Sequence, residues 1–181
     1  MLTMTPHPGK PPVADSVTVQ CQWHGARQLW LRYHVEAALE QLELPGPSEQ
    51  PERRDGLWQT TCFELFLRVP GGHAYHEFNF SPSADWAAYS FSDTRIGQAV
   101  LVLPEPPEIF GDASDTHFAL EATLTLPDLL RATELEGALS AVIAEKVGPV
   151  SYWALHHPDS AKPDFHHPGC FVADLSPPSA L

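Results

Sequence analysis

The residues with the clearest chemical potential lie on either side of a Pro70-Gly71-Gly72 turn. Glu64 stands in an alternating run before this turn, and Glu77 and Asn79 stand in a second run after it. If the turn joins two antiparallel strands, the period-two alternation places these three side chains on one sheet face. Trp58 would then lie at the entrance to the first strand.

This combination of side chains is typical of a sugar site. Carboxylates and an amide hydrogen-bond to adjacent hydroxyls, and an indole face stacks on the C–H face of a pyranose ring. The alternative interpretation is a solvated polar face with Trp58 packed at its rim. Periodicity by itself leaves both interpretations open.

A second cluster follows Leu155 in a proline-rich segment. Its members are His156, His157, Asp164, His166 and His167. Imidazole and carboxylate together suit zinc, iron or nickel. However, the flanking prolines indicate an extended loop, Lys162 would repel a cation, and the spacing matches no metal signature. We therefore expect no bound metal and a loop that faces the ligand through His156, Lys162, Asp164 and His166.

Haem binding and catalysis have less support. A haem site with methionine and histidine ligands needs a methionine near the pocket, and the chain has only Met1 and Met4. Glu64 with Glu77 is the acid pair that a glycosidase would use. The sequence contains no GxSxG, HExxH or phosphate-binding glycine loop. We expect a protein without cofactor and without catalytic residues, with a bis-histidine haem site and a hydrolase as alternatives.

Alternation with a period of two dominates the chain and predicts strands. It is clearest at 29–36 and 117–126. Further strands are predicted at 16–22, 61–69, 74–80, 86–91, 98–103, 139–145, 150–155 and 171–174. Helix-like spacing is confined to 35–42 and 126–131. Short strands between turns predict an all-β fold, an antiparallel β-sandwich with a jelly-roll-like arrangement.

We expect one ligand-binding domain at 15–176, between a flexible N-terminal arm (1–14) and a short tail (177–181). The arm and the tail are proline-rich, and the composition does not change between them. Cys21, Cys62 and Cys170 form neither a disulfide framework nor a CxxC zinc site. We therefore expect them to be small core residues with reduced thiols.

The net charge of the chain limits the classes of partner that we expect it to bind. It carries 23 acidic and 10 basic residues, a formal net charge of −13. Such a field repels phosphate backbones and anionic lipid, so we expect no nucleic acid and no membrane partner, while neutral or cationic small molecules remain open. The amino terminus lacks the apolar stretch of a secretory signal, which predicts a cytoplasmic location. No motif identifies a protein partner.

Several of these residues fall in a pattern that resembles the family 9 carbohydrate-binding modules and the DOMON-like superfamily. The pattern comprises Trp58-x5-Glu64, Tyr75-x-Glu77-Phe78-Asn79-x-Ser81-Pro82 and Trp86-x-x-Tyr89. The segments LWQTTCFELFL, EFNFSPS-x-x-WAAY and SYWALHHP…KPDFHHP-x-CF are similar to those of bacterial stand-alone DOMON-like domains. The resemblance extends from about residue 16 to about residue 175.

The resemblance implies a β-sandwich whose relatives bind sugars or haem. In the sugar-binding relatives, the ligand lies between aromatic rings and its hydroxyls meet acidic and amide groups. By motif, Trp58 corresponds to an aromatic wall, Glu64 to an acidic group and Asn79 to an amide. Phe165 or Trp153 would supply the second wall.

The sequence thus favours a non-catalytic sandwich that binds a small polar ligand, with a saccharide as the leading candidate. The alternatives are a haem- or metal-binding DOMON-type domain and a carbohydrate-active hydrolase. The expected ligand-binding residues are Trp58, Glu64, Glu77, Asn79, Trp86, His156, Lys162, Asp164, Phe165 and His166. Arg95 is expected to anchor a turn through Asp93 or a sheet edge, Tyr89 is expected in the core, and Trp153 is expected in the core or an interface.

Overall fold

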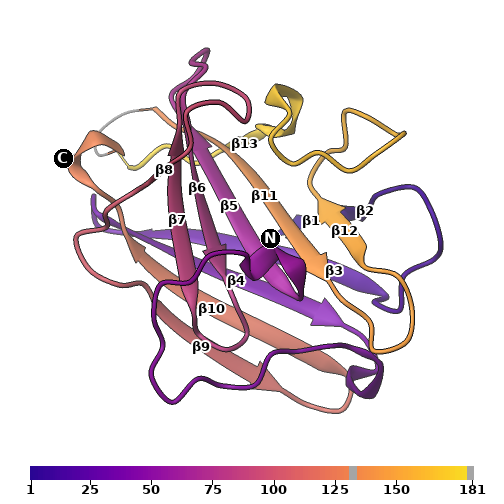
Figure 1. Ribbon diagram of the computed structural model, residues 1–181. Coiled ribbons are helices and arrows are strands. Elements are labelled where there is room, and N and C mark those ends of the chain that lie inside the picture. The colour runs from indigo at the N-terminus through magenta and orange to yellow at the C-terminus, as the bar shows by residue number, and fades with distance from the viewer. Residues whose placement is uncertain (131–133, 179–181) are drawn as a thin grey trace.

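Two antiparallel β-sheets pack face to face (Figure 1) in this computed structural model, which describes residues 1–130 and 134–178. The first sheet has the order β1 (Leu2–Thr3), β3 (Ser16–His24), β4 (Gln28–Glu36), β10 (His117–Thr125) and β9 (Glu108–Ala113). The second has the order β2 (Thr5–Pro6), β12 (Ser151–Ala154), β11 (Glu136–Ile143), β5 (Cys62–Arg68), β6 (Tyr75–Phe80), β7 (Trp86–Phe91) and β8 (Ala99–Val100), and β13 (Ala173–Asp174) pairs with β11. The predicted all-β sandwich is confirmed.

The core between the sheets follows from the alternation in β4 and β10. Leu31, Tyr33 and Val35 are buried, while the residues between them are only half-buried. The register pairs Leu120 with Tyr33 and Phe118 with Val35, so apolar side chains of neighbouring strands point to the same side. The period of two therefore sets which face of this sheet packs inward.

Strand β5 differs because it is buried on both faces. Phe63, Leu65 and Leu67 join the core between the sheets. On the opposite face, Phe66 packs against Phe171 in a second apolar cluster formed with the segment between β12 and β13. Polar residues that share this outer face are consequently shielded from water although they lie outside the sandwich core.

The expected helices are replaced by short 3-10 turns. Strand β4 continues to Glu36, and η1 (Leu39–Gln41) follows in place of a helix over 35–42. Within 126–131, η3 (Asp128–Leu130) forms, and Arg131 lies outside the described residues. The other turns of this kind are η2 (Leu57–Gln59) and η4 (Pro168–Cys170). Within the described ranges, no helix has the length and apolar character to cross a membrane.

The N-terminal arm, expected to be loose, is paired with both sheets. Strand β1 pairs with β3, and β2 pairs with β12. Between them, Met4 is 2% exposed and belongs to the main core. The proline content suggested a loose segment, but the arm supplies an apolar side chain and backbone bonds that hold it in place.

Strand β9 was not expected from the sequence, and β8 is shorter than expected. Five of the six residues of β9 are exposed, and the apolar alternation is missing because β9 forms the edge of its sheet. Of the predicted strand at 98–103, only Ala99–Val100 pairs with β7. Edge strands show a weak apolar alternation, since one of their sides has no neighbouring strand.

Candidate functional site

The candidate site lies on the outer face of the second sheet, on β5 and β6. The two strands form the expected hairpin, with Gly71 at a φ of 72° in the left-handed region that favours glycine. Glu64 pairs directly with Asn79, and Glu77 pairs with Phe66. The predicted hairpin is therefore confirmed, and Glu64, Glu77 and Asn79 share one face as expected.

Glu64 is fixed by contacts from two other strands. The Tyr33 hydroxyl donates to the backbone carbonyl of Glu64 at 2.8 Å, through the core from the first sheet. On the outer face, Ser140 of β11 donates its hydroxyl proton to Oε2 of Glu64 at 2.9 Å. The side chain is 3% exposed, and burial together with the Glu77 charge raises the pKa of Glu64 from 4.5 to about 8.

Glu77 lies on the neighbouring strand in similar surroundings. Its Oε1 accepts a hydrogen bond from Nδ2 of Asn79 at 2.8 Å. Glu77 is 5% exposed, and burial raises the pKa of its carboxyl, an effect partly offset by Asn79 and Arg95. Two buried acids side by side favour a state in which they hold a proton near neutral pH.

Asn79 supports Glu77 instead of lining the pocket. It is fully buried, and its Nδ2 donates to the Glu77 carboxylate. Its Oδ1 has no hydrogen-bond partner among the described residues. The position predicted from the sequence is correct, but the side chain lies below the pocket wall and orients an acid.

His166 closes one side of the pocket through a chain of hydrogen bonds. The backbone N–H of Arg95 donates to the Tyr75 hydroxyl oxygen at 3.1 Å. Because this oxygen already accepts from Arg95, we assign the single Tyr75 hydroxyl proton to its hydrogen bond with Nδ1 of His166, 2.7 Å away. Burial and the Arg95 guanidinium lower the pKa of His166 to about 4. The ring is therefore neutral at pH 7, with its proton on Nε2.

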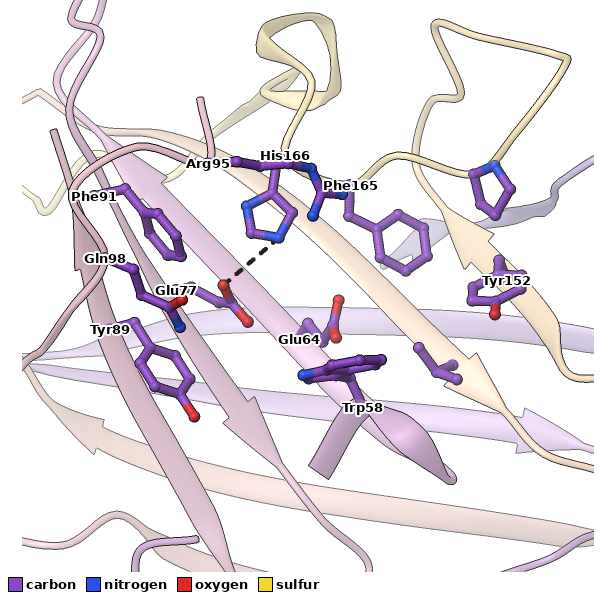
Figure 2. Close-up of a pocket in the computed structure, with 12 residues that line it drawn as sticks. Trp58, Glu64, Glu77, Tyr89, Phe91, Arg95, Gln98, Tyr152, Phe165 and His166 are labelled. Carbon is purple, nitrogen blue, oxygen red and sulfur yellow. Dashed lines mark ion pairs between the residues drawn. The ribbon is translucent and has the colours of Figure 1, made fainter. Parts of the chain in front are cut away.

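This tautomer directs an N–H toward the acids. Nε2 of His166 lies 3.8 Å from Oε2 of Glu77, the contact dashed in Figure 2. Because the ring is neutral at pH 7, the contact is a long polar approach and not a charged pair.

Aromatic rings surround the acids in a pocket of about 350 Å³. Figure 2 shows the Trp58 indole beside the acids, with Tyr89 and Phe91 on the β7 side. Phe165 and Tyr152 lie on the β12 side, with ring centroids 6.1 Å apart. Phe165 thus occupies the region expected for the second wall, whereas Trp153 is buried in the main core.

Trp58 is presented by the 3-10 turn η2. Gly56 precedes this turn with a φ of 78°, a conformation that L side chains rarely adopt. The indole is 54% exposed, and no other large aromatic side chain of the wall is so open to solvent. An apolar indole face exposed to water at the mouth of a pocket has an unfavourable hydration free energy, and a ligand that covers the face removes this cost.

Arg95 has a different role from the one expected. It lies in the turn between β7 and β8 with a φ of 57°, and its guanidinium pairs with Oδ1 of Asp164 at 2.7 Å. The pair joins that turn to the segment that carries Phe165 and His166. Asp164 is therefore a structural partner of Arg95, and Arg95 lines the pocket.

Other predicted residues lie elsewhere. Trp86 packs against the core between the sheets because it alternates with Ala87, which faces outward. His156 and Lys162 are exposed and are not part of the pocket wall. Among the described residues, no three His, Cys, Asp or Glu side chains are grouped in a way that would hold a metal ion.

The sequence analysis missed several wall residues. These are Tyr89, Phe91, Arg95, Gln98, Val142, Tyr152 and Pro163. The signal for two of them was present, since Tyr89 pairs with Glu77 in the register of β6 and β7 and Phe91 follows two positions later. Arg95 and Tyr152 reach the pocket only through the tertiary arrangement.

The two acids lie on the same side of the pocket. Both rise from one sheet face, on adjacent strands, with aromatic rings around them. This arrangement presents oxygen acceptors to a polar group and apolar surfaces to a carbon frame. It suits recognition of a small ligand that has both characters.

Comparison with known proteins identifies the fold. The sequence matches no family model, and a search of curated proteins finds no match either. The solved structure of a candidate carbohydrate-binding protein from Bacteroides uniformis aligns with a TM-score of 0.65 and 14% identity, over 94% of this chain and 84% of that chain. A family 9 carbohydrate-binding module from Caldicellulosiruptor kristjanssonii, solved with cellotriose, aligns with a TM-score of 0.52 and 13% identity, over 93% and 82%. This chain therefore has a β-sandwich fold like that of the family 9 carbohydrate-binding modules.

Proposed function

We propose that this protein binds a saccharide, without catalysis, in the pocket between Trp58 and Phe165. The observation that carries the proposal is an exposed indole beside two buried carboxyl groups, Glu64 and Glu77. The indole would cover the C–H face of a sugar ring, and the acids would accept hydrogen bonds from its hydroxyls. The pocket volume of about 350 Å³ lies within the usual range for small-ligand sites.

The likeness to sugar-binding proteins supports this proposal through the fold. The Bacteroides uniformis protein is a candidate carbohydrate-binding protein, and the Caldicellulosiruptor kristjanssonii module was solved with cellotriose. Kinship with bacterial stand-alone DOMON-like domains belongs to the same proposal and rests on the motifs around Trp58, Glu77 and Phe165. Fold alone does not assign a ligand, so the chemistry of the pocket carries the argument.

The position of the acids favours binding over hydrolysis. A glycosidase places two carboxyl groups on either side of the scissile bond. Here Glu64 and Glu77 project from the same face of one sheet, and Ser140 and Asn79 hold one oxygen of each. Both acids would therefore contact a ligand from the sheet side of the pocket, an arrangement that suits hydrogen bonding to neighbouring hydroxyls.

Calorimetric titration with glucose and cellotriose tests the proposal. We expect binding by the wild type and a loss of about thirtyfold in Trp58→Ala, which corresponds to about 2 kcal/mol of lost stacking. The matched control is Phe110→Ala, an aromatic side chain that is 66% exposed on the edge strand β9 of the other sheet. This control should keep the affinity of the wild type.

Thermal melts of the same variants separate binding from folding. A stacking tryptophan that is exposed in the free protein leaves no core cavity, so Trp58→Ala should melt close to the wild type. Loss of a core tryptophan would cost about 3–5 kcal/mol, or roughly ten degrees at this size. A large fall in melting temperature with unchanged affinity would contradict the assignment of Trp58, and a Soret band in the purified protein would favour the haem alternative.

A further inference from the structure

We infer that the pocket prefers a sugar that carries a free ammonium group over the same sugar with a hydroxyl at that position. The inference rests on the proposed function and names the substrate class of the same site. It follows from the buried acids, their unused oxygen atoms, and the aromatic rings around them.

The first observation is that, among the described residues, no arginine or lysine forms an ion pair with either acid. Glu64 and Glu77 are 3% and 5% exposed, so water compensates their charge poorly. Arg95 is the basic side chain in the described pocket wall, and its guanidinium already pairs with Asp164 at 2.7 Å. A cationic ligand would supply the charge that the pocket lacks.

The second observation concerns which carboxyl oxygens are in use. Ser140 donates to Oε2 of Glu64, and Asn79 donates to Oε1 of Glu77. Within the described part of the chain, the other oxygen of Glu64 accepts no hydrogen bond, and Oε2 of Glu77 has the 3.8 Å approach of His166 in place of one. An ammonium group carries three donors, whereas a hydroxyl carries one. A single ammonium could therefore serve both acids.

The aromatic wall adds a second attraction for a cation. The rings of Trp58, Tyr89, Phe91 and Phe165 line the same space as the acids. The face of an aromatic ring attracts a cation, most strongly for an indole and when water is excluded. The net charge of −13 further raises the local concentration of cations around the protein.

Proton linkage provides an independent readout. In the free protein, burial and mutual repulsion keep a proton on the acid pair near neutral pH. A bound ammonium would stabilise the ionised pair, so binding would release protons. The other titratable side chains that face the pair or lie against it are Cys62, Tyr75, Tyr89, Arg95, Tyr152 and His166. Burial raises the pKa values of Cys62, Tyr75 and Tyr89 above their ordinary values, so these three groups stay protonated at the working pH.

The test compares two trisaccharides with the same β-1,4-linked glucose frame. Cellotriose carries hydroxyls at each C2, and the glucosamine trimer carries ammonium groups there. Calorimetry at about pH 6, where such amines are protonated, should show roughly tenfold tighter binding of the glucosamine trimer. The enthalpy should differ between buffers of different ionisation enthalpy, because protons are released. The N-acetylated trimer, which has no ammonium, should lose the preference.

Variants connect the preference to the acids. Glu77→Gln and Glu64→Gln should each reduce the preference for the glucosamine trimer toward one. The control Glu108→Gln removes the same charge from an exposed position on β9 and should keep it. Having two variants protects the test if one of them folds poorly.

The outcomes distinguish this inference from the proposed function. Equal or tighter binding of cellotriose by the wild type would overturn the ammonium preference and leave saccharide binding in place. The same holds if the N-acetylated trimer binds as well as the amine, or if neither Gln variant changes the preference. If none of the three sugars binds, the proposed function fails, and the preference fails with it.

Discussion

Replacing Glu64 by Gln tests whether ionisation of the buried acids lowers the free energy of unfolding of the free protein. The change keeps the shape of the side chain and an oxygen that can accept the Ser140 hydroxyl proton. It removes the carboxyl whose pKa burial and Glu77 raise from 4.5 to about 8. The free energy of unfolding should therefore respond to pH differently in the variant.

The sign follows from proton binding. Between pH 4.5 and 8 the folded chain holds the proton on Glu64 and the unfolded chain has released it, so stability falls as pH rises. His166 acts oppositely below pH 6.5, because burial lowers its folded-state pKa to about 4. The pKa values of His76 and His157 are also lowered by burial. These histidines are present in both the wild type and Glu64→Gln, so the difference between the two proteins from pH 6.5 to 8 isolates the contribution of Glu64.

The expected magnitude can be worked from this window. One pKa unit corresponds to about 1.4 kcal/mol, so between pH 6.5 and 8 the wild type should lose about 2 kcal/mol of unfolding free energy relative to Glu64→Gln. Glu64→Gln should lack this contribution to the slope, and it should be more stable than the wild type at pH 8. The slope that remains in the variant belongs to the other titrating groups, among them Glu77, whose pKa burial also raises, and the buried histidines.

Urea unfolding at several pH values, followed by tryptophan fluorescence, measures the slope. Glu108→Gln serves as the control, since it removes one exposed charge from the other sheet and should retain the slope of the wild type. A wild type whose stability does not fall relative to Glu64→Gln over this window would refute the reasoning. So would a Glu64→Gln variant with the same slope as Glu108→Gln.

Three further changes test other features. Met4→Ala should lower the unfolding free energy in urea by about 2–4 kcal/mol, because the arm fills part of the core; an unchanged midpoint would mean the arm is not docked. Ala84→Gly should raise it by about 0.5–1 kcal/mol, since Ala84 has a φ of 69°, and a lower melting temperature would argue against strain there. Tyr75→Phe should alter the ring nitrogen-15 shifts of His166, and an unaltered spectrum would contradict the assigned tautomer.

Local sequence patterns predicted the sheet face that carries the two acids. The Pro70-Gly71-Gly72 turn and the alternation on both sides place Glu64, Glu77 and Asn79 on one sheet face, and the structure has this arrangement, with Glu64 paired to Asn79. The same alternation carried information about β7 that was not used, because Tyr89 and Phe91 face the acids while Trp86 faces the core. Period and turn chemistry are local properties, so a single sequence contains them.

The sides of the pocket could not be predicted in this way. Arg95 and Asp164 are 69 positions apart, and no spacing rule connects them. Phe165 and His166 reach the acids because the segment after β12 returns over the outer face of the sheet. That return depends on burying Phe66 and Phe171, which is a consequence of tertiary packing. The proline-rich composition of this segment indicated an extended loop but not its destination.

The paired N-terminal arm has a consequence for the order of folding. A single residue, Met4, separates β1 on one sheet from β2 on the other, so both edges must be in place before the arm can complete its pairing. Thr5 and Ala154 are 149 positions apart, and closing so long a loop is slow unless earlier structure has already brought its ends together. We therefore expect the arm to dock late. Protection of its amides from hydrogen exchange would then mark the moment at which the two sheets have stacked.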